Sequence, residues 1–297
     1  MAANVARELS RGAARVIAVD LDPQNALGMH FGLDLRDAFG FLATLRYAAD
    51  PRAAWRAALR SSPSGVSFLP YGQLGMDGAN AAEAALAERP EMLSSAMADM
   101  LSVAGVTVVA DLPAGPSQAL SAVLRHADLV VTPILPSPAS VAQVPALEAG
   151  RFAGLGAPGG LEPARLRFVI NQWGAPGRLA GAIAQGAVQQ LAARLLGAVR
   201  YDEAVPDACA AQRLVGDFAP ASTAAQDLAG LTAAITAEIA AQRAAAQPTA
   251  GRPTAGIEAR GGLGSVRSPQ LRNVSPLISL AEILPKSRST VAQKANR

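Results

Sequence analysis

Short apolar runs alternate with longer amphipathic stretches through residue 242 of the chain. This alternation is typical of a mostly parallel sheet whose two faces are covered by helices. We therefore expect an α/β fold with a doubly wound sheet. The predicted strands are Arg15–Asp20, Val66–Pro70, Val106–Asp111, Leu129–Ile134, Arg167–Asn171 and a short one near Ala198–Arg200.

Helices are expected between these strands. Asp50 followed by Pro51 is a favourable helix start, because Asp accepts hydrogen bonds from free N–H groups and Pro fits the first turn. The predicted helices are Ala2–Leu9, Pro51–Leu59, Pro90–Val103, Ser117–His126, Ser140–Leu147, Gly177–Leu196, Asp202–Gln212 and Ser222–Gln242.

The composition changes after residue 242. The segment 243–297 is rich in Gly, Pro, Ala and Ser and carries seven Arg and two Lys against two Glu, a balance of +7. Since the whole chain carries +3, residues 1–242 carry −4. We expect 1–242 to be the folded domain and 243–297 a disordered basic tail. Such a tail can contact nucleic acid, anionic lipid or acidic partners, or can be solvated without a function.

One segment of the tail departs from its surroundings. Ser275 as N-cap and Pro276 at the first position precede apolar residues at 277, 280, 281 and 284. This spacing predicts a two-turn amphipathic helix over 275–284. An isolated helix of this length is marginal in water, so it would fold only on a partner or a membrane surface. A docking motif and an inert remnant are equally compatible with the sequence.

The composition excludes several kinds of site. Cys209 is the only cysteine, which excludes an internal disulfide and a multi-cysteine zinc site. With only His30 and His126, a histidine-based metal site is not expected. Residues 1–12 carry both signs of charge, unlike a signal peptide, and no apolar run reaches the length of a membrane span. We expect a cytoplasmic protein.

Carboxylates follow two of the predicted strands. Asp20 ends the first apolar run and Asp22 follows one residue later, before Pro23 and Gln24. The run 106–110 ends in Asp111. Parallel strands deliver such groups to the sheet edge where phosphate and Mg²⁺ chemistry is usually done. Each also has a structural explanation, because Asp22 with Pro23 can initiate a turn and Asp111 can cap the next helix.

These motifs resemble those of the deviant-Walker ATPases of the MinD/ParA type. The order is a helix beginning Ala2-Ala3-Asn4, a strand ending D-x-D-P-Q, and a strand ending D-L-P about a hundred residues downstream. The resemblance implies Mg²⁺ and ATP as cofactors, with Asp20 and Asp111 near the metal and Asp22 orienting the attacking water. It also implies that Asn171 hydrogen-bonds the adenine edge, although Asn171 could equally cap its own turn.

The phosphate-binding loop of that family is missing from the sequence. No G-x-x-x-x-G-K-[ST] occurs in the 297 residues, and the family pattern would place it immediately before Met1. We expect the fold to lack its first strand, which is central in the family sheet, and to expose the edges of the neighbouring strands. A truncated start is the favoured explanation because the helix after Met1 is intact. A degenerate relative that does not bind ATP is the alternative.

Three further stretches are similar to the bacterial cellulose-biosynthesis ATPases of the BcsQ family. They are L-P-Y-G-Q-L at 69–74, D-E-A at 202–204 and A-A-Q-R-L-V-G-D-F at 210–218, and the resemblance covers about 2–240. It implies an accessory ATPase of cellulose synthesis and secretion that forms a nucleotide-dependent homodimer. The implied partners are the cellulose synthase machinery and a small regulatory subunit, with peripheral contact to the inner membrane or cell pole. A nucleic-acid partner is not expected. The alternatives are a positioning ATPase for DNA, flagella or other cargo, and a scaffold without nucleotide.

Overall fold

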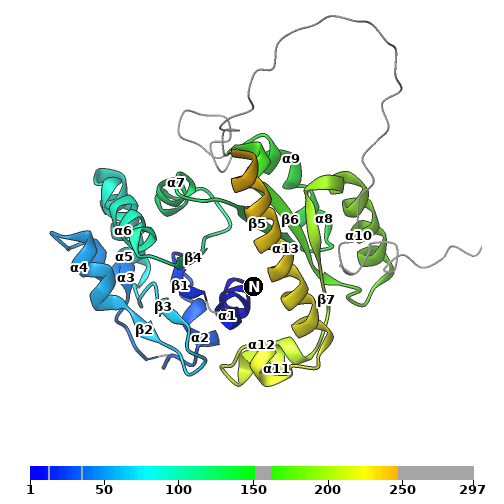
Figure 1. The fold of residues 1–297 in the computed structure, drawn as a ribbon, viewed down its shortest axis with the longest axis horizontal. Coiled ribbons are helices and arrows are strands. Elements are labelled where there is room, and N and C mark those ends of the chain that lie inside the picture. The colour runs from blue at the N-terminus through cyan, green and yellow to red at the C-terminus, as the bar shows by residue number, and fades with distance from the viewer. Residues whose placement is uncertain (13, 35, 151–161, 247–297) are drawn as a thin grey trace, which may run out of the picture. The chain divides into compact units, whose positions relative to one another are not determined.

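A computed structural model describes residues 1–246 except 13, 35 and 151–161 (Figure 1). The chain divides into two units, Met1–Gln247 and Pro248–Arg297, and the described residues all belong to the first. The helix predicted over 275–284 and nearly all of the predicted tail therefore lie outside the described residues.

The first sheet has four strands in the order β2-β3-β1-β4. Its central strand β1 (Arg15–Asp20) is parallel to β3 (Ser67–Leu69) on one side and to β4 (Val106–Asp111) on the other. The two-residue strand β2 (Arg60–Ser61) is antiparallel to β3. The last five residues of β1 are buried, which fits a strand paired on both sides and covered on both faces.

The second sheet has three parallel strands in the order β5-β6-β7. These are β5 (Val130–Ile134), β6 (Leu166–Trp173) and β7 (Leu195–Arg200). The central strand β6 contains the fully buried residues Phe168, Val169 and Ile170. The parallel pairing predicted from the sequence is confirmed, and it is distributed over two sheets.

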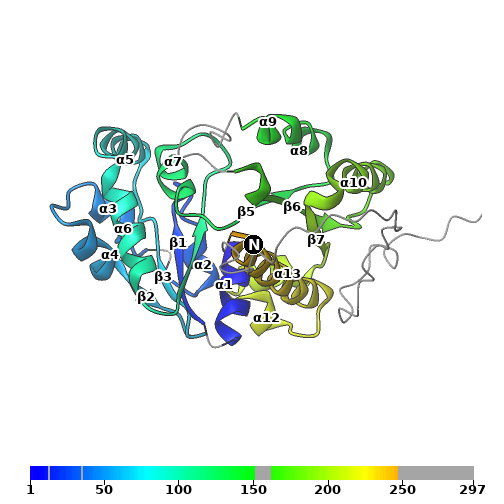
Figure 2. The same cartoon turned by 45° about the horizontal axis from the view of Figure 1, so that its top comes forward.

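Helices surround both sheets, and Figure 2 shows α1 between the strands of the first sheet and α13. Among the described residues, none of these helices is long and apolar enough to cross a membrane. The helices are α1 (Ala2–Arg11), α2 (Leu27–His30), α3 (Phe41–Leu45), α4 (Pro51–Ala58), α5 (Met76–Glu88), α6 (Glu91–Ser102), α7 (Gln118–Leu124), α8 (Pro138–Val141), α9 (Val144–Glu148), α10 (Arg178–Leu191), α11 (Ala204–Ala210), α12 (Val215–Phe218) and α13 (Thr223–Ala246).

Several predicted elements were wrong in their bounds. The helix predicted over Gly177–Leu196 ends at Leu191, because the apolar residues after Arg194 pair with β6 as β7. The helix predicted over Ser140–Leu147 is two short helices, α8 and α9, and the first begins earlier because Ser137 caps it and Pro138 occupies its first turn. The sequence analysis missed α2, α3, α5, α12 and β2.

Candidate functional site

Asp20 ends β1 with a fully buried side chain (0% exposed). Its Oδ1 accepts the N–H of Asp22 at 3.1 Å and its Oδ2 accepts the N–H of Leu27 at 2.9 Å. The carboxylate therefore ties the loop after β1 back to the strand end. Because both oxygens accept a backbone N–H, Asp20 has a structural role whatever else it binds.

Burial is the main reason that the pKa of Asp20 is raised to about 7. The backbone N–H groups of Leu27 and Asp22 lower this pKa, whereas the negative charges of Asp111 and Asp22 raise it. Two carboxylates close together in a partly dry site cannot both ionise at low cost. Ionising both acids at the strand end therefore costs free energy, and a bound cation would lower this cost.

Asp111 lies directly beside Asp20, since the two residues are register partners at the ends of β4 and β1. Burial raises the pKa of Asp111, the positive charge of the Met1 amino group lowers it, and the charge of Asp22 raises it. Burial in turn lowers the pKa of the Met1 amine, against the attraction of Asp111. The N-terminus of α1 thus lies at the same edge as the carboxylates.

Asp22 completes the group and also forms a turn. Its Oδ1 accepts the N–H of Gln24 at 2.9 Å, which is the turn that the residue types allow. Its N–H donates to Asp20, and its charge acts on both Asp20 and Asp111. The structure therefore brings together three of the four predicted site residues.

Asn171 lies apart from that group. It belongs to β6 in the second sheet, is half-buried, and is the register partner of Val199. The strand continues through Trp173, so the expectation that Asn171 ends its strand was wrong. No hydrogen bond among the described residues joins Asn171 to Asp20, Asp22 or Asp111.

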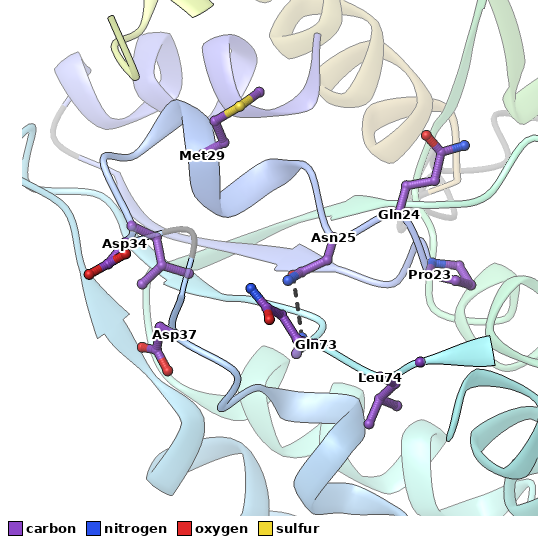
Figure 3. A pocket seen from close by; sticks show the side chains of 11 residues that line it. Pro23, Gln24, Asn25, Met29, Asp34, Asp37, Gln73 and Leu74 are labelled. Atoms are coloured by element: carbon purple, nitrogen blue, oxygen red, sulfur yellow. Dashed lines mark hydrogen bonds between the residues drawn. The ribbon is translucent and has the colours of Figure 1, made fainter. Parts of the chain in front are cut away.

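A cavity of about 510 Å³ is lined by Pro23, Gln24 and Asn25, which follow Asp22 in the chain (Figure 3). Its walls come from the loops after β1 and β3, from α2 and from the segment after α2, including Gln24, Met29, Asp37 and Leu74. The lining contains amide and carboxylate groups together with apolar side chains, so the cavity suits a ligand of mixed polarity.

The L-P-Y-G-Q-L stretch forms one wall of this cavity. The N–H of Gly72 donates to Oδ1 of Asn25 at 3.3 Å, which joins this stretch to the residues after D-x-D-P-Q (Figure 3). A Cβ on Gly40 would lie only 2.2 Å from the nitrogen of Gly72, so the backbones meet at a distance that glycine alone permits. The sequence showed both motifs but not their contact, which depends on the neighbouring positions of β1 and β3.

The residues present fit one half of a Mg-ATP site. Carboxylates at a sheet edge suit a hydrated Mg²⁺, which prefers oxygen ligands and keeps several waters. Among the described residues, however, no group of three or more His, Cys, Asp or Glu can hold a metal ion. The only lysines in the chain are Lys286 and Lys294, outside the described residues. The chain thus supplies acidic groups, and the donors that would hold the phosphates are not found among the described residues.

Comparison with solved structures identifies the type of fold. The chain is similar to the septum site-determining protein MinD of Pyrococcus horikoshii OT3, solved with Mg-ADP (TM-score 0.62, 17% identity, covering 81% of this chain and 91% of that one). It is also similar to the cell division ATPase MinD of Pyrococcus furiosus (0.61, 18%, 80% and 91%) and to a ParA family ATPase of Chlorobium tepidum TLS (0.58, 18%, 78% and 90%). At these identities the likeness establishes a MinD/ParA-type P-loop NTPase fold.

The family is given by the sequence. No match was found among curated proteins. The family model described as cellulose biosynthesis protein BcsQ, in contrast, matches residues 1–235. Because that range covers most of the 297 residues, the chain belongs to the cellulose biosynthesis protein BcsQ family.

Proposed function

We propose that this chain is an accessory ATPase of bacterial cellulose synthesis and secretion. The family supports a positioning ATPase, and its name supports the cellulose role. In this proposal the protein works as a nucleotide-dependent homodimer beside the cellulose synthase machinery and a small regulatory subunit, in peripheral contact with the inner membrane.

The meeting of Asp20, Asp111 and Asp22 at the end of two adjacent parallel strands carries the proposal. Asp20 and Asp111 would hold the water shell of a Mg²⁺ ion, and Asp22 would orient the water that attacks the γ-phosphate. Asn171, which precedes the last two residues of β6, would contact the adenine. The bound nucleotide supplies the phosphoryl group that is transferred to water.

The missing phosphate donors favour a second candidate, a scaffold that uses the same fold without nucleotide. An acidic cluster repels a polyanionic nucleotide unless Mg²⁺ and donor groups compensate.

The neighbouring genes separate the cellulose role from other positioning roles, since cellulose synthase genes beside this one would favour the cellulose role.

The role of Asp22 is tested in the chain extended before Met1 by an apolar strand and K-G-G-x-G-K-[ST]-[ST]. We expect Asp22→Ala to lower ATP hydrolysis about 100-fold or more, the range typical of a positioned base or water-orienting group. Binding of Mg-ATP should change little, because such a group acts mainly in the transition state.

Asp50→Ala is the matched control. Asp50 makes the same kind of contact, accepting the N–H of Arg52 at 2.9 Å, but lies at the start of α4 and does not line the cavity. We expect this variant to hydrolyse ATP like the parent. An equal loss of binding and hydrolysis in Asp22→Ala would assign Asp22 to the metal or to folding. A parent that binds no Mg-ATP would support the scaffold.

A further inference from the structure

The stretch A-A-Q-R-L-V-G-D-F at 210–218 takes no part in the proposed nucleotide site. It runs from the end of α11 through α12, which lies beside α1 (Figure 1). Most of its residues form the turn between the two helices or pack against α1. Arg213 and Phe218 are the exceptions among its large side chains, because both are exposed.

The turn between α11 and α12 fixes the backbone of Arg213. Gln212 has a left-handed backbone (φ +53°), and its N–H donates to the carbonyl of Cys209 at 2.9 Å. The N–H of Arg213 donates to the carbonyl of Ala208 at 2.8 Å. Both bonds use carbonyl groups at the end of α11, as in the common ways of closing a helix. The place of Arg213 therefore follows from the end of α11.

The buried part of the stretch holds α12 against α1. Leu214 and Val215 are buried in hydrophobic clusters that include residues of α1. A Cβ on Gly216 would lie 2.9 Å from Oε1 of Glu8, so glycine permits the close approach of the two helices. The carboxylate of Asp217 is paired with two arginines of α1. Helix α12 is thus a firmly attached support.

Arg213 and Phe218 lie next to each other on this support. The guanidinium carbon of Arg213 is 5.6 Å from the centre of the Phe218 ring, within the range of a cation–π contact. Nη2 of Arg213 also donates to the carbonyl of Asp217 at 2.6 Å. Phe218 is 38% exposed. Two contacts therefore hold the exposed arginine in one position beside the exposed ring.

Arg213 forms no ion pair with any of the residues that the structure describes. The two acids of this corner, Glu8 and Asp217, are paired with Arg7 and Arg11 instead. A guanidinium has five N–H groups, and the contact with the Asp217 carbonyl uses only one nitrogen of Arg213. The others suit a carboxylate, which arginine can bind through two parallel hydrogen bonds.

We propose that Arg213 and Phe218, which we call the Arg213–Phe218 corner, bind a short acidic segment of another protein. A carboxylate of that segment takes the free donors of Arg213, and an apolar side chain beside it packs on the ring of Phe218. Side chains that are already ordered lose little entropy on binding. Arginine and aromatic side chains are also the ones that most often dominate the affinity of an interface.

The charge of the corner favours a single carboxylate over a polyanion. Residues 1–242 carry a net charge of −4, which opposes the approach of nucleic acid or an anionic membrane. Those partners are bound by several cations together. At the corner, the arginines of α1 are already paired, which leaves Arg213 alone for a ligand. One guanidinium beside one ring matches one carboxylate beside one apolar side chain.

This proposal goes beyond the proposed function, and its test uses the 297-residue chain without nucleotide, so its failure would leave the nucleotide site untouched. The probe is a capped peptide of about five residues with a central glutamate flanked by leucines. The matched peptide has glutamine at the centre. NMR shifts of the Arg213 Nε–H and of the α12 amides measure binding. We expect the glutamate peptide to bind about tenfold more tightly, as one charge-assisted contact allows.

Two variants assign the binding to the corner. Arg213→Gln should abolish the preference for glutamate, and Phe218→Ala should weaken binding of the glutamate peptide about threefold. Arg125→Gln is the matched control and should bind like the parent. Arg125 is likewise exposed and forms no ion pair with the described residues, but it follows α7.

The comparison of the two peptides needs no variant, so it does not depend on the folding of one. Equal binding of both peptides by the parent protein, or binding of neither, would overturn the proposal. An unchanged preference in Arg213→Gln would overturn it as well. Binding of phosphatidylglycerol vesicles or of DNA that is lost in Arg213→Gln, without binding of the glutamate peptide, would instead make the corner a site for polyanions.

Discussion

At the scale of single residues, the account depends on one buried carboxylate. Asp20 is fully buried, accepts two backbone N–H groups and lies beside Asp111. Its raised pKa means that the folded protein binds a proton at Asp20 more readily than the unfolded chain does. The contribution of this group to stability is therefore greatest below its ordinary pKa of 3.8 and is lost as the pH rises through about 7.

We expect Asp20→Asn to change how stability depends on pH. Near pH 5 the variant should be less stable, because the amide offers one acceptor for two N–H groups. Between pH 5 and 8 the difference in unfolding free energy should move in favour of the variant by about 2.5 kcal/mol, since each unit of pKa shift corresponds to about 1.4 kcal/mol. Urea unfolding at the two pH values measures this. If the difference in unfolding free energy between the variant and the parent were the same at both pH values, the assignment of Asp20 as a buried acid would be contradicted.

Much of the site at this scale could be predicted from the sequence. Asp20, Asp22 and Asp111 each end or follow an apolar run, and parallel strands bring such residues to one edge. The contact between Asn25 and Gly72 could not be predicted, because it depends on two loops meeting at glycine backbones.

At the scale of elements, helix α1 packs against strands of both sheets and begins near the site. Oδ1 of its Asn4 accepts the N–H of Val215 at the start of α12. Asp217 of α12 pairs with Arg7 at 3.0 Å and with Arg11 at 2.9 Å. Burial alone would raise the pKa of Asp217, but the hydrogen bonds and charges of the two arginines outweigh it and hold this pKa below its ordinary value.

We expect Asp217→Asn to lower the unfolding free energy by about 1 kcal/mol at pH 7, because the partly buried Arg7 and the more exposed Arg11 lose their carboxylate partner. A lowered pKa stabilises the fold above the ordinary value of the group and loses this effect as the pH falls through the lowered one. The loss in the variant should therefore shrink at acid pH.

Asp128→Asn is the control for this change. Asp128 pairs with Arg243 at 2.8 Å, but both side chains are largely exposed. We expect an effect within about 0.5 kcal/mol. If urea unfolding showed equal losses of unfolding free energy in the two variants, the contact between α1 and α12 would contribute no more to stability than an exposed ion pair.

The elements that sequence analysis located best were those with strong local signals. β1 and β4 were predicted with their observed bounds, because each is an apolar run that ends at Asp. In α5, alanines along the helix blur the apolar stripe, so its periodicity gave little signal. The two residues of β2 form a strand only because β3 lies beside them.

At the scale of the whole molecule, the parallel strands form two sheets, with β4 at an edge of the first sheet and β5 at an edge of the second. The sequence predicted open edges because the phosphate-binding loop and its strand are absent from it. The structure locates those edges at β4 and β5, which periodicity alone could not do because it carries no information on strand order. Exposed apolar edges also predict a poorly soluble protein.

The central claim is that Asp20, Asp22 and Asp111 form the acidic part of a nucleotide site, and that these 297 residues without a phosphate-binding loop do not bind ATP. Titration of the 297-residue chain with Mg-ATP, followed by thermal unfolding, tests this most directly. We predict no saturable rise in melting temperature for this chain and a clear rise for the chain extended before Met1 by an apolar strand and a phosphate-binding loop. Mg-ATP at a concentration of 100 times its Kd would stabilise a protein with a working site by about 2.7 kcal/mol. A saturable stabilisation of the unextended chain would contradict the account, because it would require phosphate donors within the chain itself.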